Sequence, residues 1–192
     1  MKKSIILLLL FTFACKQQSE TIITPWEAYD ESEELAENAN HESRKLQYKL
    51  IQSKITDKNE IWKNVSPQIQ YFSERDYQEL KPLIYEQDIP TIQSHIKSGA
   101  LTYEKLTQWY LFRIVKFEND RYKTLNAIIN INPKAVEEAR KRDINKSAND
   151  HPIYGMPILV KDNVNMEGIP TTAGAHAFLN NETSDAFIIE RM

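Results

Sequence analysis

The segment that most constrains the fold of this chain is a short apolar run, Ile158 to Val160, that lies between two turns. Residues 155–157 form the first turn and residues 168–170 the second, because glycine and proline most often end regular structure. A continuous apolar run of this kind is typical of a strand that is buried on both faces of a parallel sheet. The sequence therefore predicts a short buried strand with Lys161 at its carboxyl end.

Lys161 is the first candidate functional residue. A lysine after an apolar run is usually a surface lysine, whose stem packs against the protein while its ammonium stays in water. In open α/β sheets, ligands bind outside the carboxyl ends of the strands, so the position of Lys161 favours a functional site. Its position alone leaves both interpretations open.

The first third of the chain shows the patterns of amphipathic helices. Thr24, Pro25 and Glu27 form a capping-box pattern with proline at the first helical position, which predicts a helix start. An apolar stripe follows at helical spacing, formed by Leu46, Leu50, Ile51 and Ile55. We interpret the acidic residues between these two patterns as a solvated surface.

The rest of the chain predicts further helices around strand-like segments. The helix signals are Ser73 before one helix, Gly99 after the next, Thr102 before a third, Pro133 in the first turn of a fourth, and Ser184 or Asp185 before a short last one. Each is a residue type that commonly caps or ends a helix. Residues 125–132 are apolar and strand-like. This alternation of helix and strand indicates an α/β protein.

Composition excludes several classes of function. At 192 residues, the chain is long enough for one ordinary domain with a hydrophobic core. Its net charge of −3 offers no basic surface to a phosphate backbone, so we expect no nucleic-acid partner. The single cysteine, Cys15, excludes an internal disulfide and a cysteine zinc cluster, and the 4 histidines are scattered. We therefore predict no metal site and no cofactor.

Residues 1–14 have the features of an export signal, with two lysines and then an apolar run from Ile5 to Phe13. This run is shorter than the roughly 20 residues that a membrane-spanning helix needs. Its end at an alanine and Cys15 resembles the bacterial lipoprotein signal, although Thr12 stands where that motif usually has leucine. We expect an exported lipoprotein that is anchored to the membrane by acyl chains on Cys15, with a tether over residues 15–23. The alternative is an ordinary secretory signal with an incidental cysteine.

The second half of the chain resembles the N-terminal part of an amidase signature family enzyme. The strongest portion is "YGMPILVKDNVNMEGIPTTAGAHAFL", which is similar to that family's Lys-Asp-Asn segment and its Thr-Thr-Ala-Gly element. The segments "SGALTYEKLTQWYLFRI", "LNAIININPKAVEEA" and "SDAFIIERM" fit the same family in the right order. One departure is Ala175, where many members have serine. The resemblance covers residues 89–192.

The resemblance implies a fold and a chemistry. The fold is α/β: a helical N-terminal extension over residues 24–88, then, over residues 89–192, the incomplete start of a mixed or parallel sheet covered by helices. The chemistry is hydrolysis of a small amide or a peptide amide by a serine, cis-serine, lysine triad, in which Lys161 matches the lysine. A lysine at its usual pKa of about 10.4 is protonated, but desolvation can lower that value by several units. The apolar run before Lys161 is expected to supply such surroundings.

The chain departs from the family pattern in its serines, because none of its segments has the Gly-Ser-Ser-Gly type that carries the two catalytic serines and the oxyanion hole. We therefore expect an N-terminal fragment of an amidase that is inactive alone and has a missing C-terminal polypeptide as its partner. The export signal argues against a subunit that amidates charged transfer RNA, which would be cytoplasmic. The alternative function is a non-catalytic, lipid-anchored module that binds a protein through an unpaired sheet edge.

Overall fold

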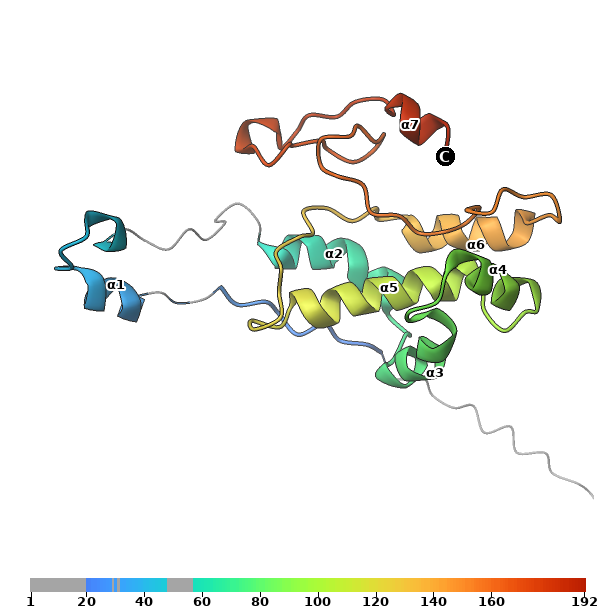
Figure 1. Cartoon of the computed structure of the whole chain (residues 1–192), viewed down its shortest axis with the longest axis horizontal. Coiled ribbons are helices and arrows are strands. Elements are labelled where there is room, and N and C mark those ends of the chain that lie inside the picture. Colours follow the sequence, from blue (N-terminus) through green and yellow to red (C-terminus); the bar gives the residue numbers. More distant parts are fainter. Residues whose placement is uncertain (1–19, 29, 31, 48–56) are drawn as a thin grey trace, which may run out of the picture.

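A computed structural model describes residues 20–28, 30, 32–47 and 57–192 of the chain. Its regular elements in these ranges are α-helices and short 3₁₀ helices (Figure 1). In chain order they are α1 (Ser32–Asn38), η1 (Arg44–Gln47), α2 (Lys58–Ile69), α3 (Glu74–Ile84), α4 (Ile89–Lys97), α5 (Tyr103–Glu118), α6 (Ala135–Asn145), η2 (His176–Phe178) and α7 (Phe187–Glu190). The predictions for residues 1–14 and for Cys15 lie outside the described residues.

Helix α5 is the centre of the helical layer, by which we mean residues 57–145. It packs against α2, α3 and α6, and α3 also packs against α4 (Figure 1). Leu106 and Trp109 of α5 are fully buried. The Trp109 ring stacks on Tyr77 of α3 with 4.9 Å between ring centroids, and the Trp109 indole N–H donates to the Tyr77 carbonyl oxygen at 3.0 Å. One pair of residues therefore joins two helices by both apolar contact and a hydrogen bond.

Three predicted helix signals lie at helix ends of this layer. The Ser73 side chain accepts a hydrogen bond from the Asp76 N–H at the start of α3, and the Asp76 carboxylate accepts from the Ser73 N–H, which completes a capping box. The Thr102 side chain accepts from Lys105 N–H at the start of α5. Gly99, after α4, has a φ of 78°, in the left-handed region that favours glycine. The predicted helix signals at Ser73, Gly99 and Thr102 are confirmed.

The N-terminal segment, residues 20–28, is extended, so the helix predicted to start at Thr24 is wrong. The reason is that side chains of the helical layer bind its backbone groups. Asn59 accepts from Trp26 N–H at 2.8 Å and donates to the Trp26 carbonyl oxygen at 2.9 Å, while Asn119 donates to the Thr24 carbonyl oxygen at 2.7 Å. The indole of Trp26 also packs against the core.

The apolar stripe predicted between Leu46 and Ile55 cannot be followed through the structure, because residues 48–56 lie outside the described residues. Leu46, which is described, belongs to η1 and is 52% exposed. An apolar side chain on a packed helical face would be covered, so this first residue of the predicted stripe does not contribute to a core.

The predicted α/β fold is wrong for the part of the chain that the structure describes, which contains helices and no β-strand. Its nearest approach to a sheet is an isolated antiparallel bridge between Met166 and Ile169, inside a tight turn. Residues 125–132 and 158–160 are irregular rather than strands. An apolar, β-branched sequence favours an extended backbone, but a strand also needs a neighbouring strand to take up its N–H and C=O groups. Neither segment has such a neighbour among the described residues.

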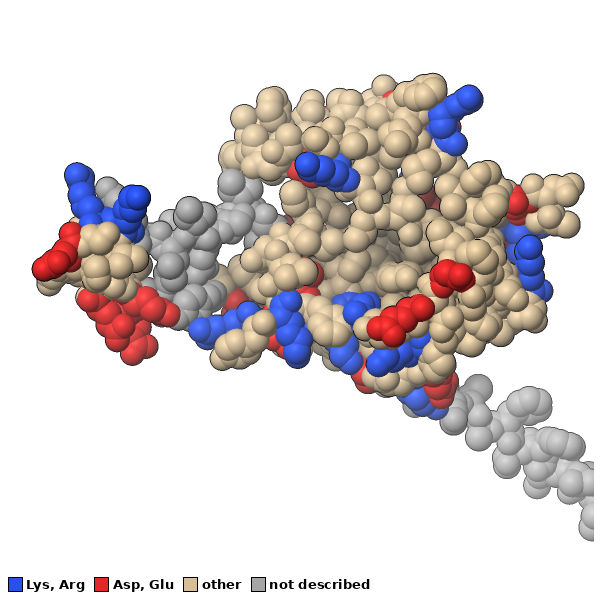
Figure 2. Space-filling model, viewed as in Figure 1, with Lys and Arg blue, Asp and Glu red and all other residues tan. Residues whose placement is uncertain are grey.

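The C-terminal segment, residues 157–192, lies alongside the helical layer and contains η2 and the single-turn helix α7 (Figure 1). The side of it that faces the viewer in Figure 2 carries few charged side chains. Many of its large apolar residues are exposed, among them Leu159 at 76% and Phe187 at 75%. None of the helices in the described ranges is long and apolar enough to cross a lipid bilayer.

Candidate functional site

Lys161 follows the apolar run, but it does not lie at the end of a buried strand. Ile158 is 46% exposed and the Lys161 side chain is exposed. The Lys161 carbonyl oxygen accepts from Val164 N–H at 2.9 Å, so the lysine is the first residue of a four-residue turn. The prediction of a buried strand beside Lys161 is wrong for the described residues, and they do not supply the apolar surroundings that we expected around its amine.

The turn before this run attaches the lysine-bearing segment to the helical layer. Gly155 has a φ of 71°, and a Cβ placed on it would lie 2.6 Å from ring atoms of Tyr103 in α5. The Tyr103 hydroxyl donates to Gln93 Oε1 at 2.9 Å, and Gln93 in turn donates to the Pro152 and Tyr154 carbonyl oxygens at 2.9 and 3.1 Å. Only glycine fits this close approach. The turn covers residues 152–155, so it ends at the glycine with which the predicted turn, residues 155–157, begins.

Asp162, the residue after Lys161, organises the segment that follows. Its Oδ1 accepts from Thr172 N–H at 2.9 Å, and its Oδ2 accepts from Gly174 N–H at 3.0 Å and from the Thr172 hydroxyl. Its backbone carbonyl oxygen accepts from Ala173 N–H at 2.8 Å. We call this group, Asp162 with residues 172–174, the Asp162 clamp. It brings the Lys-Asp-Asn segment and the Thr-Thr-Ala-Gly element together.

The Asp162 clamp favours the ionised carboxylate. Partial burial alone would raise the pKa of Asp162, but the hydrogen bonds from the Thr172 hydroxyl, Thr172 N–H and Gly174 N–H outweigh burial and hold the pKa below its ordinary value. Asp162 is therefore a charged acceptor near neutral pH. The sequence did not predict this role. A loop separates Asp162 from Thr172 and Gly174, and no characteristic spacing in the sequence identifies these residues as its hydrogen-bond donors.

Two further hydrogen-bonded contacts hold the C-terminal segment together. Thr171 N–H donates to the Asn181 carbonyl oxygen at 3.0 Å, and Asn181 Nδ2 donates to the Thr171 carbonyl oxygen at 3.0 Å. Asp185 Oδ1 accepts from Glu167 N–H at 2.7 Å. The predicted cap of the last helix by Ser184 or Asp185 is wrong, since Ala186 occupies the N-cap position of α7 without a side-chain hydrogen bond and Asp185 binds Glu167 instead.

A second lysine, Lys58, is the buried one, with 3% of its surface exposed. Its ammonium donates to the Glu118 carbonyl oxygen at 2.6 Å, to Glu118 Oε2 at 3.2 Å and to the Thr124 hydroxyl. Burial raises the pKa of Glu118, but hydrogen bonds from Thr124 and Lys58 exceed this effect, so that its pKa lies below the ordinary value. The Lys58 ammonium and the Glu118 carboxylate neutralise each other, which is typical of a structural ion pair. No local sequence signal relates two residues 60 positions apart.

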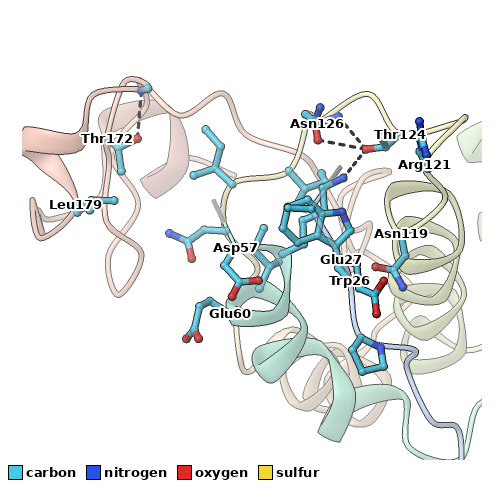
Figure 3. A pocket seen from close by; sticks show the side chains of 18 of the residues that line it. Trp26, Glu27, Asp57, Glu60, Asn119, Arg121, Thr124, Asn126, Thr172 and Leu179 are labelled. Atoms are coloured by element: carbon cyan, nitrogen blue, oxygen red, sulfur yellow. Dashed lines mark hydrogen bonds between the residues drawn. The ribbon is translucent and has the colours of Figure 1, made fainter. Parts of the chain in front are cut away.

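A cavity of about 1210 Å³ lies between the helical layer, the N-terminal segment and residues 172–179. Figure 3 shows Thr172 and Leu179 on one side of it and Asn119, Arg121 and Thr124 on the other. Its wall combines apolar side chains with both signs of charge, among them Trp26, Ile61, Asp57, Glu60, Arg121 and His176. Lys161 is not one of its lining residues, so the cavity and the candidate base are separate features of the described structure.

Metal ligands do not gather in the described ranges. No group of three or more histidine, cysteine, aspartate or glutamate side chains there is placed to hold a metal ion.

The chain is similar to known proteins of the amidase type. Residues 106–192 match the family model described as Amidase. The A subunit of glutamyl-tRNA(Gln) amidotransferase from Exiguobacterium sp. is 30% identical over 111 residues, which are 57% of this chain and 22% of that protein. The protein of the same name from Methanocaldococcus jannaschii is 40% identical over 86 residues, 43% of this chain and 19% of that protein.

Solved structures show the same similarity. An amidase family protein from Bacillus anthracis superposes with a TM-score of 0.66 at 33% identity, over 72% of this chain and 28% of that one. The native peptide amidase from Stenotrophomonas maltophilia superposes with a TM-score of 0.52 at 34% identity, over 56% of this chain and 22% of that one. The resemblance to the amidase family is confirmed for residues 106–192, which include Lys161 and the Asp162 clamp. The chain spans between 19% and 28% of the length of these four proteins.

Proposed function

We propose that this chain supplies the lysine-bearing part of a site that hydrolyses amides, with Lys161 as the base. The observation that carries the proposal is the amidase match over residues 106–192. This range includes Lys161, which the sequence resemblance matches to the family's lysine. Similarity to solved amidases at 33% and 34% identity supports the same conclusion. The lysine lies beside a hydrogen-bonded clamp, which gives its backbone a defined place.

The chemistry requires a neutral Lys161 amine. Such an amine accepts the proton of a bridging serine, and that serine takes the proton of a second serine, whose oxygen attacks the amide carbonyl. The carbon–nitrogen bond then breaks, the amine or ammonia leaves with a proton, and water releases the acyl group as a carboxylic acid. The 192 residues contain no Gly-Ser-Ser-Gly segment to supply the two hydroxyls. We therefore infer that turnover needs a serine-bearing polypeptide, and that this polypeptide covers the exposed Lys161.

The substrate class that we propose is a small carboxylic amide or a C-terminal peptide amide, and the site is exported on a lipid anchor. The similarity to a peptide amidase supports the peptide branch. The similarity to glutamyl-tRNA(Gln) amidotransferase points to the other branch. The export features of residues 1–14, which the structure does not describe, favour the first of these.

The test combines this chain with the segment that carries the two serines, taken from an amidase relative and supplied either as a separate polypeptide or as a fusion. Hydrolysis is followed by release of ammonia from a simple amide and from an amidated dipeptide. We expect turnover in the combined preparation, none from this chain alone, and loss of turnover with Lys161→Ala. Lys63→Ala, which removes an exposed lysine of α2, is the matched control. Equal turnover by the wild type and Lys161→Ala would remove Lys161 from the mechanism.

Membrane attachment has a separate test. We propose that acyl chains on Cys15 anchor the exported chain, since two or more such chains hold a protein stably at a bilayer. Cys15→Ser should release the chain into the soluble exported fraction. Unchanged partitioning of Cys15→Ser, together with a wild-type mass that shows no acyl group, would support the ordinary secretory signal instead.

The second candidate is a non-catalytic module that binds a protein, and it is favoured by the exposed apolar residues of the C-terminal segment. Leu159, Phe178 and Phe187 have at least half of their surface in solvent. Because the described residues form no sheet, binding would use these side chains rather than a sheet edge. The combined preparation separates the two candidates: a stable complex with the serine-bearing polypeptide but no turnover would favour binding alone.

A further inference from the structure

Asp162 lies directly after the candidate base and is the hub of the hydrogen bonds that follow it. Its side chain and backbone carbonyl together accept from three successive residues, Thr172, Ala173 and Gly174. Hydrogen bonds to an ionised acceptor are about twice as strong as those between neutral groups. The bonds to the Asp162 carboxylate are therefore strong polar links between the Lys161 turn and residues 172 and 174.

The backbone conformation of the clamp is one that needs support from its surroundings. Ala173 has a φ of 48° and Gly174 a φ of 74°, both in the left-handed region. For a residue with a Cβ, such a conformation is strained and persists only when its surroundings hold it. Successive N–H groups in this arrangement form a concave site for an anion. Here the carboxylate of Asp162 fills that site from within the chain.

Apolar packing does not fix the lysine turn in this part of the structure. Leu159 is 76% exposed, and Lys161 itself is exposed. The backbone on the carboxyl side of Lys161 is instead held by its own turn hydrogen bond from Val164 N–H and by Asp162. A loss of the Asp162 carboxylate would therefore weaken the support of the Lys161 backbone without opening an apolar core, and would leave the two backbone hydrogen bonds at Lys161 and Asp162 in place.

We propose that Asp162 is a positioning residue for Lys161: its carboxylate, bound by residues 172–174, fixes the direction from which the lysine amine reaches the bridging serine. This inference rests on the proposed function. Asp162 does not itself exchange a proton in the reaction. Both of its oxygens already accept hydrogen bonds, and the lowered pKa keeps the carboxylate ionised. Its action is through the backbone that it shares with Lys161.

The first experiment measures amide hydrogen exchange at Thr172 and Gly174 in this 192-residue chain. Asp162→Ala should speed exchange at Thr172 by at least about tenfold, the effect of losing a hydrogen bond to a charged acceptor. The effect at Gly174 should be smaller, because its N–H also donates to the Thr172 hydroxyl at 3.1 Å. Asp162→Asn keeps one acceptor oxygen and should speed exchange at one of the two amides much more than at the other. Asp185→Asn is the matched control, because that carboxylate binds Glu167 N–H and not residues 172–174. Equal exchange in the wild type and Asp162→Ala overturns the clamp.

The second experiment measures kcat and KM in the combined preparation with the serine-bearing polypeptide. Positioning predicts that Asp162→Ala lowers kcat about 10²-fold with little change in KM, since misplacement of a reacting group by about 1 Å has this effect. Asp162→Asn should recover part of the loss, and Asp185→Asn should retain the wild-type kcat. Faster exchange with an unaltered kcat would show a structural clamp only and overturn the positioning role. Failure of the proposed function is distinct, because then Lys161→Ala itself leaves turnover unchanged.

Discussion

In the helical layer, residues 57–145, large apolar side chains such as Trp109 and Leu106 are fully buried, whereas in the C-terminal segment, residues 157–192, many of them face solvent. The buried residues of that segment, all of which the structure describes, are the polar Thr171 and Thr172. The first region is thus held mainly by apolar burial and the second by hydrogen bonds to Asp162, Asn181 and Asp185. The two regions should respond to different perturbations.

Lys58 of the helical layer and Lys161 of the C-terminal segment differ in the same way as the two regions. Lys58 is buried and neutralised by Glu118, while Lys161 is exposed beside the Asp162 clamp. A buried, fully paired lysine contributes to structure, and it has no free donor or open approach for a substrate. An exposed lysine on a well-defined turn is available to a second polypeptide. Burial alone would point to Lys58, whereas the base that we propose is Lys161.

The largest expected effect comes from breaking the apolar core of the helical layer. Trp109→Ala removes the fully buried ring that stacks on Tyr77 and should lower the free energy of unfolding by about 3–5 kcal/mol. Denaturant unfolding followed by far-UV circular dichroism measures this change. A loss below about 1 kcal/mol would mean that the ring is not part of a tightly packed core.

The buried ion pair should have the next largest effect. Lys58→Ala leaves the Glu118 carboxylate without its cation, which should lower the free energy of unfolding by about 2–3 kcal/mol. The loss is below the roughly 3–5 kcal/mol typical of broken buried pairs because Thr124 still donates to Glu118 at 2.8 Å. In a double-mutant cycle with Glu118→Gln, strict additivity of the two losses would argue against the pair.

The connection between the two regions can be tested at Gly155. Gly155→Ala places a Cβ against the Tyr103 ring at a positive φ, and overpacking of this kind costs about 1–3 kcal/mol. We expect faster hydrogen exchange in residues 152–160 while the helical layer keeps its stability. Tyr103→Ala removes the clash, so Gly155→Ala should cost less in that background. The same cost in both backgrounds would place the strain in the backbone alone.

Acid should affect the C-terminal segment through Asp162. Its pKa is lowered in the folded state, so the clamp contributes stability that is fully present above the unfolded pKa of about 3.9 and is lost as pH falls through the folded pKa. Exchange at Thr172 and Gly174, corrected for intrinsic rates, should therefore remain slow at neutral pH and quicken below about pH 4. Asp162→Ala should abolish this acid response. A response that survives the substitution would have another titrating group as its source.

The smallest effect is expected at an exposed apolar residue of the C-terminal segment. Leu159→Ser should alter the free energy of unfolding of this chain by less than about 0.5 kcal/mol, because the side chain is 76% exposed. The same substitution should weaken association with a serine-bearing polypeptide if that polypeptide covers the segment. Ile144→Ser, at an exposed site on α6, is the matched control for changes in solubility.

Three helix ends of the helical layer could be predicted from the sequence, because residues near them favour a helix cap or a helix end. Ser73 and Thr102 cap their helices with side-chain oxygens, and Gly99 ends α4 at a positive φ, as each residue type favours. Such contacts span three or four residues, so the local sequence is enough to predict them. The amidase resemblance could also be predicted from the sequence, since "KDN" and "TTAG" lie in one contiguous stretch. The family match over residues 106–192 confirms this resemblance.

The wrong predictions concern segments whose conformation depends on partners that are distant in the sequence. Thr24, Pro25 and Glu27 have the signature of a helix start, yet Asn59 and Asn119 bind the backbone of that segment and keep it extended. The apolar runs at 125–132 and 158–160 have the composition of strands, yet no described segment pairs with them. Strand formation depends on a partner's N–H and C=O groups, which no local pattern encodes.

By itself, the sequence determined the helix signals at Ser73, Gly99 and Thr102, the glycine turn at Gly155 and the amidase-like motifs, because each depends on the intrinsic preferences of adjacent residues. Tertiary structure alone decided that Lys58 is buried against Glu118, that Lys161 is exposed, and that Asp162 binds residues 172–174. The physical reason is that burial and charge pairing are properties of groups brought together across long stretches of chain. Their free energies depend on distance and solvent exposure in space, which the order of residues does not record.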